Sequence, residues 1–174
     1  MSVFYLIVLR IIHIAASVGW AGGSFVFFFF IEPTAKALAP TGAQFVQHMV
    51  AKRRFNVFMV IASTLTVLTG GLLLWKLTSG QLVNYARTGP GLGFVLGSIA
   101  GIVVYCIGMF GVAPRAKKMA EIGQEIQEAG GPPTAVQGSL LQKLDKEMST
   151  LGLADFILVA LSLGLMGTAR YWWF

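Results

Sequence analysis

The sequence predicts an all-α fold, a polytopic membrane four-helix bundle, and two observations lead to this prediction. The chain has 174 residues, of which 56% are hydrophobic and only 11% are charged, and its mean hydropathy is +0.75. About a quarter of the residues in a soluble domain are charged, so these values exclude an ordinary soluble enzyme. In addition, four apolar runs follow one another, and each is long enough to cross a bilayer as a helix.

We expect one transmembrane domain over residues 1–174, with spanning helices at about 3–31, 55–77, 91–113 and 151–173. The first segment lacks a basic start, and Arg10 and His13 interrupt it. It is therefore predicted to be a retained helix and not a signal peptide. The lipid bilayer is the expected partner, and nucleic acid is excluded because the basic residues flank apolar segments instead of forming an exposed stripe.

The distribution of Lys and Arg predicts the orientation. Nine of the 13 basic residues lie in two long loops, 32–54 and 114–149. Because Lys and Arg accumulate on the cytoplasmic side, we expect both loops in the cytoplasm and both termini on the outer side of the cell inner (plasma) membrane. An aromatic belt at the outer interface agrees with this orientation and comprises Tyr5, Trp75, Tyr85, Tyr171, Trp172 and Trp173.

A short internal similarity suggests a duplication. The first span exits through residues 33–38 (PTAKAL), and the third exits 81 residues later through residues 114–119 (PRAKKM). Each exit precedes an amphipathic segment and a further span, which predicts two tandem helical hairpins. The alternative is that proline and lysine simply suit helix exits on the cytoplasmic side.

Candidate site residues lie on one face of the first span. Ionisable groups inside a bilayer are costly, so each marks a candidate site. Arg10, His13, Ser17 and Ser24 share a helix face, and His13 lies about 15 Å from the outer end of the helix. Its neutral imidazole can bind haem iron or copper or relay protons. The alternative is a packing histidine that is hydrogen bonded to a neighbouring helix.

The other histidine, His48, precedes the second span on the predicted cytoplasmic side. The first helix extends about 27 Å from His13 to its inner end, so the two histidines cannot share one metal. A haem at His13 would therefore take its second axial ligand from Met166, water or another chain, or leave that position open.

Two further features of the later spans bear on packing and chemistry. Gly93, Gly97 and Gly101 repeat at four-residue spacing, which is typical of closely packed membrane helices. Asp155 lies about one turn inside the fourth span. It is expected to reach the interface or to pair with Arg54 or Lys146, and a proton relay is the alternative.

The segment 12–25, IHIAASVGWAGGSF, resembles the opening helix of copper-resistance-D-type membrane proteins. This group includes uncharacterised four-helix integral membrane families and is distantly similar to the bacterial membrane protoporphyrinogen oxidase. The resemblance implies a four-helix bundle in which His13 binds haem b or copper. Two features depart from these relatives, since the third span has no lysine to pair with the histidine and the chain offers few copper ligands.

Three functions follow from these observations. The first is a haem b or metal site at His13, supported by Arg10, Ser17 and Met166, in a redox protein or an accessory to a membrane complex. The second is a copper or small-solute permease, and the third is a non-catalytic membrane subunit. Another membrane subunit or a second copy is the expected protein partner. The chain has no GxSxG, P-loop or HExxH motif, so enzymatic activity is left open.

Overall fold

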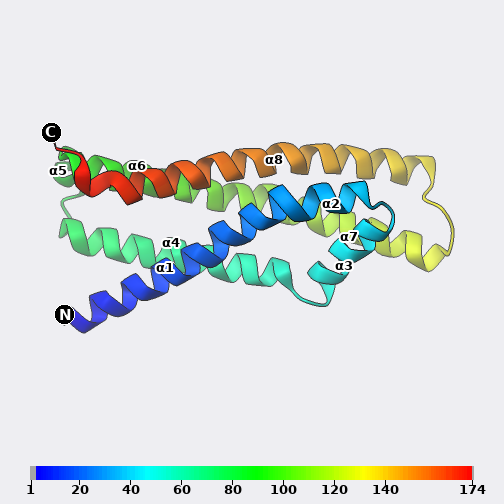
Figure 1. Ribbon diagram of the computed structural model, residues 1–174, viewed down its shortest axis with the longest axis horizontal. Coiled ribbons are helices and arrows are strands. Elements are labelled where there is room, and N and C mark those ends of the chain that lie inside the picture. The colour runs from blue at the N-terminus through cyan, green and yellow to red at the C-terminus, as the bar shows by residue number, and fades with distance from the viewer. Residues whose placement is uncertain (1–2, 174) are drawn as a thin grey trace.

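The computed structural model describes residues 3–173 and consists of helices joined by short connections (Figure 1). The four longest elements are α1, Val3–Val26; α4, Phe55–Thr78; α6, Gly89–Cys106; and α8, Ala135–Thr168. The others are α2, Glu32–Ala37; α3, Thr41–Ala51; α5, Leu82–Ala86; α7, Ala113–Ala129; and a 3-10 turn, Ala169–Tyr171. The expected all-α fold is confirmed.

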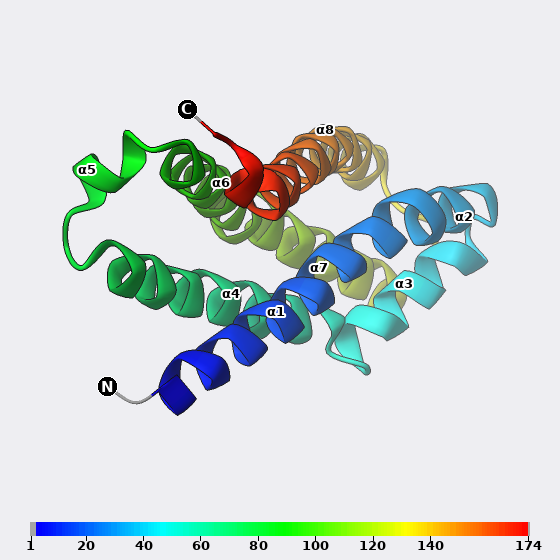
Figure 2. The ribbon, with the colours of Figure 1, turned by 60° about the vertical axis from the view of Figure 1, so that its left-hand side comes forward.

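The helices form two pairs, α1 with α4 and α6 with α8 (Figure 2). Four continuous helical stretches are long and apolar enough to cross a bilayer, namely Val3–Ala37, Phe55–Thr78, Gly89–Ala129 and Ala135–Tyr171. Many large apolar side chains on them are exposed, such as Phe110 at 77%. Such side chains are stable only against lipid, so the chain is a multi-pass membrane protein whose helices contact the bilayer.

The first long helix of each hairpin ends in a π-helical turn. These turns are η1, Phe27–Ile31, and η2, Ile107–Val112, and each ends two residues before a proline, Pro33 or Pro114. Proline has no backbone N–H, and its ring collides with the carbonyl four residues earlier, so a widened turn relieves the strain without breaking the helix. The similarity between the two exits therefore extends from sequence to backbone geometry.

Local signals explain how α8 begins and how α3 is held. Gly130 ends α7 in the left-handed region at φ 65°, and Thr134 and Gln137 form a capping box at the start of α8. Such a box satisfies helix N–H groups that have no partner in the helix. At the other connection, a Cβ on Gly42 of α3 would collide with the backbone of Ala35 in α2. Glycine therefore permits α3 to fold back closely along α2.

The core lies where the four long helices converge. One residue from each helix contributes, and together Trp20, Ala62, Val104 and Val159 form a cluster that we call the central layer. Val104 has no exposed surface and Trp20 is 9% exposed. Because each residue comes from a different helix, the layer fixes the two hairpins against each other and contains no polar side chain other than the indole.

The glycines of α6 face α8, as their spacing predicts. A Cβ on Gly97 would lie 2.7 Å from Cγ of Met166, and the Ser162 hydroxyl donates a hydrogen bond of 2.8 Å to the Gly97 carbonyl oxygen. A Cβ on Gly93 would lie 2.8 Å from Cβ of Ala169. The absence of side chains at these positions allows the two backbones to approach closely enough for hydrogen bonding.

We expect Gly97→Leu to destabilise the protein by about 1–3 kcal/mol, because the new side chain must displace Met166. Gly164→Leu is the matched control, since a Cβ on Gly164 would meet nothing within 4 Å. Thermal unfolding in mild detergent measures the difference. Equal midpoints for the two variants would contradict close packing of α6 on α8.

Candidate functional site

His13 packs against α4 and is half-buried. Its Nδ1 atom lies 2.9 Å from the carbonyl oxygen of Thr66 and 3.3 Å from Oγ1 of Thr69. The Thr66 carbonyl can only accept, and the Thr69 hydroxyl already donates to the Leu65 carbonyl. Both contacts therefore require Nδ1 to carry the proton, and in the neutral imidazole Nε2 is then the atom with a free lone pair.

Glycine and serine complete the histidine's surroundings. A Cβ on Gly70 would lie 2.8 Å from Cε1 of His13, so the ring fits against α4 only because that position has no side chain. Ser17, one turn further along α1, donates a 2.6 Å hydrogen bond to the His13 carbonyl oxygen and lies 3.5 Å from Oγ1 of Thr66. His13 and Ser17 therefore belong to one polar contact between α1 and α4, which we call the histidine contact.

The other predicted site residues take separate positions. Arg10 lies one turn before His13 and is exposed, so it stays available to an anionic group. Met166 packs on α6 at Gly97, in the second hairpin, whereas His13 contacts the first. Figure 2 shows that the N-terminal part of α1 diverges from α8. The structure brings Ser17 to His13 but does not bring Met166 to it.

Residues that could complete a metal site are dispersed. His48 is an exposed residue of α3, and Cys106 is exposed on α6. Within residues 3–173, no group of three or more His, Cys, Asp or Glu side chains is arranged to hold a metal ion. His13 is therefore not part of any such group in the described part of the chain.

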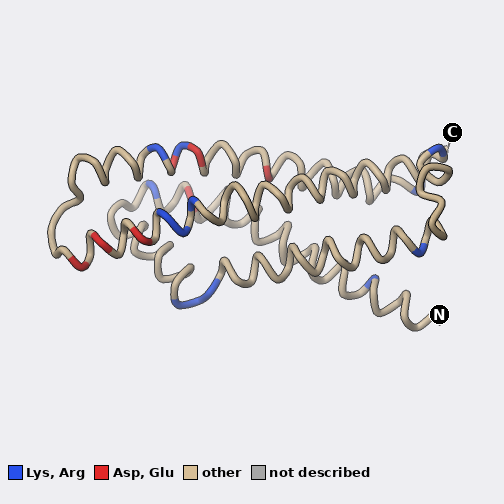
Figure 3. The backbone as a smooth tube through the Cα atoms, turned by 180° about the vertical axis from the view of Figure 1, so that it is seen from behind, with Lys and Arg blue, Asp and Glu red and all other residues tan. Residues whose placement is uncertain are grey.

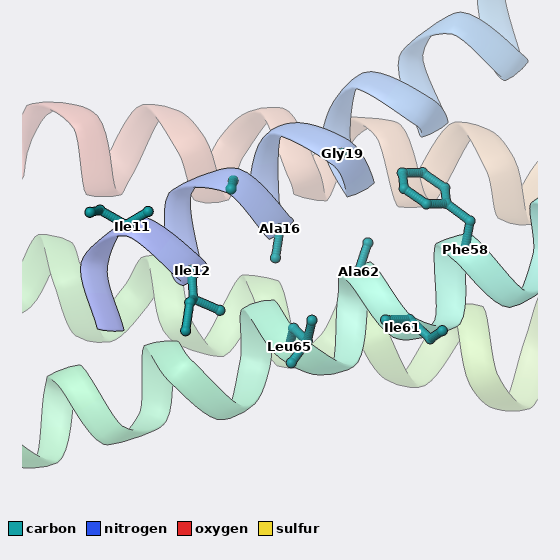
Figure 4. Close-up of a pocket in the computed structure, with 9 residues that line it drawn as sticks. Ile11, Ile12, Ala16, Gly19, Phe58, Ile61, Ala62 and Leu65 are labelled. Atoms are coloured by element: carbon teal, nitrogen blue, oxygen red, sulfur yellow. The ribbon is translucent and has the colours of Figure 1, made fainter. Parts of the chain in front are cut away.

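A shallow groove of ≈ 320 Å³ runs between α1 and α4. Figure 4 shows side chains of both helices converging on it, and its lining is apolar: Ile11, Ile12, Ala15, Ala16, Gly19, Phe58, Ile61, Ala62 and Leu65. His13 is not among these residues. The groove is suited to a lipid acyl chain and offers no polar side chain to a solute.

A polar cluster joins the two hairpins at the end opposite the termini. The Lys36 ammonium group of α2 lies 2.8 Å from Glu32, 3.2 Å from Asp145 and 2.9 Å from the Ser149 hydroxyl, and that hydroxyl lies 2.7 Å from Glu32. We call these four residues the loop-end cluster. Sequence reasoning missed it, because only the Glu32–Lys36 spacing is visible along the chain, and the partners on α8 are more than 100 residues away.

A second ion pair lies beside this cluster, outside the apolar segments. Arg115 of α7 donates a 2.7 Å hydrogen bond from Nε to Glu147 of α8. This hydrogen bond holds the pKa of the Glu147 carboxyl below its usual value. The pair is about one-third exposed and therefore contributes little stability, but it fixes how α7 lies along α8.

We expect Gly70→Ala to destabilise the protein relative to Gly71→Ala by about 1–3 kcal/mol, because the new methyl group must displace the His13 ring. Both changes raise helix propensity equally, and a Cβ on Gly71 would meet nothing within 4 Å. Thermal unfolding of the two variants isolates the clash. If they unfold at the same temperature, His13 does not pack against Gly70.

Comparisons with known proteins add no assignment to this description. No protein-family model matches the chain, and neither the curated proteins nor the solved structures contain a match.

Proposed function

We propose that this inner-membrane protein binds haem b, or alternatively a metal ion, through His13 and serves in electron transfer or as an accessory subunit of a membrane complex. The observation that carries the proposal is the hydrogen bond from Nδ1 of His13 to the Thr66 carbonyl oxygen. Metal-binding histidines commonly donate their second ring N–H to such an oxygen, which fixes the ring and directs the other nitrogen to the metal.

The available donors favour haem over a free copper ion. A closed copper site needs several protein ligands, whereas no group of three or more His, Cys, Asp or Glu side chains in the described residues is arranged to hold a metal ion. Haem brings four nitrogen ligands of its own and needs only an axial ligand from the protein. In this proposal His13 is that ligand, and exposed Arg10, on the same helix face, pairs with a propionate. Bound haem would supply one-electron transfer.

Met166 would not help to hold the group in this proposal, because that residue packs in the other hairpin. A further ligand would come from water or from a second chain. A second copy is consistent with the half-exposed face of α1 at His13, and it would make the homo-oligomer part of the site.

The distribution of charge supports an orientation with the loop end in the cytoplasm. Figure 3 shows most Lys and Arg residues, and nearly all Asp and Glu residues, at the end formed by α2, α3, α7 and the start of α8. The end with the termini and α5 carries the few remaining basic residues, Arg10, Lys76, Arg87 and Arg170. The positive-inside rule then places the termini outside the cytoplasm.

We expect protein purified after haem-replete expression to show a Soret band that His13→Ala loses and His48→Ala retains. Thr69→Val, which removes one hydrogen bond to Nδ1, should weaken haem affinity by about tenfold or more without abolishing it. Absorption spectra and haem titration measure both effects. Wild-type protein with neither a Soret band nor bound copper would overturn the cofactor proposal and favour the non-catalytic subunit.

The orientation has its own test. A reporter that is active only outside the cytoplasm should be active when it is fused to the C-terminus and silent when it is inserted after Gly130, in the turn between α7 and α8. The opposite pattern of activity would show that the loop end faces outward.

A further inference from the structure

Asp155 is the only acidic residue within the segments 3–31, 55–77, 91–113 and 151–173, and the histidine contact does not use it. Its position on α8 points into the bundle. Residues 152, 155, 159, 162, 166 and 169 recur at spacings of three and four, which places them on one helix face. Gly152 contacts Phe28, Val159 belongs to the central layer, and Ser162 is hydrogen bonded to Gly97.

The surroundings of Asp155 contain one polar partner and several aromatic rings. Across the crossing of α1 and α8, its carboxyl group interacts with the Ser24 hydroxyl. The neighbouring Phe156 stacks on Phe28, with ring centroids 6.1 Å apart, and lies edge-on to Phe29 at 4.8 Å. The carboxyl group is therefore half-buried beside apolar rings and a neutral hydroxyl.

No cation in the described residues neutralises this carboxyl group. Two cations on the loop side are already paired with other carboxylates, Lys36 with Glu32 and Asp145, and Arg115 with Glu147. Neither Arg54 nor Lys146, the partners expected from sequence, forms an ion pair with Asp155 in residues 3–173. The one side chain that interacts with it from a neighbouring helix in the described residues, Ser24, is neutral.

An ionised carboxylate without a cation is costly in a medium of low dielectric, so the group must bind a proton or a cation. We propose that Asp155 is a proton-binding site inside the membrane, formed where α1 crosses α8 and loaded from the loop end. A proton suits the site better than a metal ion, because Asp155 and Ser24 supply too few oxygen ligands to replace a cation's hydration shell.

The structure gives this site access from one side. Ser149 of the loop-end cluster precedes Asp155 by six residues, about 9 Å along α8. A shallow pocket of ≈ 350 Å³ beside the cluster reaches Phe28 and Leu153, which lie within one helical turn of the site. On the side of the termini, the central layer lies one helical turn away from the site, with Trp20 next to Ser24 along α1 and Val159 next to Asp155 along α8. Its apolar side chains close the path on that side.

Dicyclohexylcarbodiimide, a membrane-soluble reagent that modifies protonated carboxylic acids, tests the proposal on the full chain in lipid vesicles at neutral pH. We expect Asp155 to be the main labelled residue by peptide mass mapping. Asp155→Asn should lose the label, and Asp145→Asn, which changes an exposed carboxylate on the same helix, should retain it. Mapping on the wild-type chain decides the question even if Asp155→Asn does not fold.

Two outcomes would overturn the proposal. An unlabelled Asp155 at neutral pH would show that the carboxyl group is ionised, and protection from labelling by Na⁺ or K⁺ at constant pH would identify a metal cation as the occupant. Access is tested by raising the pH on one side of oriented vesicles. Labelling should fall when the loop end faces alkaline buffer and persist when the termini do, and the reverse result would exclude loading from the loop end. None of these readouts depends on a haem at His13.

Discussion

Close approach of helix backbones at glycine residues is the constraint on which this bundle depends. Lipid offers no hydrophobic driving force between helices, so contacts rely on packing and on hydrogen bonds that form only at short range. Gly97 lets Ser162 reach a backbone carbonyl across the contact of α6 with α8. Gly70 lets the His13 ring reach the carbonyl of Thr66. In both hairpins, a glycine on one helix leaves room for a polar side chain of the partner helix.

The polar groups inside the bundle lie at two levels. The histidine contact lies toward the termini and the Ser24–Asp155 pair lies toward the loop end, with Trp20 of the central layer between them on α1. His13 and Ser24 lie on one face of α1, yet His13 contacts α4 and Ser24 contacts α8. This follows from the course of α1, which packs on α4 along much of its length and also reaches α8 near its end (Figure 1).

The hairpins are alike at their exits and different in their chemistry. Both widen into a π-helical turn before a proline, and both continue as helix beyond it. Only the first hairpin carries a histidine within the apolar segments 3–31, 55–77, 91–113 and 151–173, and only the second carries a carboxylate there. The two hairpins therefore share a backbone feature but differ in their polar residues, and the loop-end cluster connects them.

Composition and hydropathy alone determined the all-α class and the four membrane-crossing helices, because those properties depend on the length and apolarity of single segments. Spacing along one helix also placed His13 with Ser17 and aligned Gly93 with Gly97. Partners on other helices were beyond such reasoning. That Met166 packs on α6 depends on how α8 lies along α6. That Asp155 meets Ser24 instead of a basic residue, and that Lys36 joins Asp145 and Ser149, depend on how α1 and α2 cross α8. Only the tertiary structure decided these contacts, because the angle at which two helices cross arises from the packing of whole helix faces. The sequence of either helix shows no periodic pattern from which that angle could be predicted.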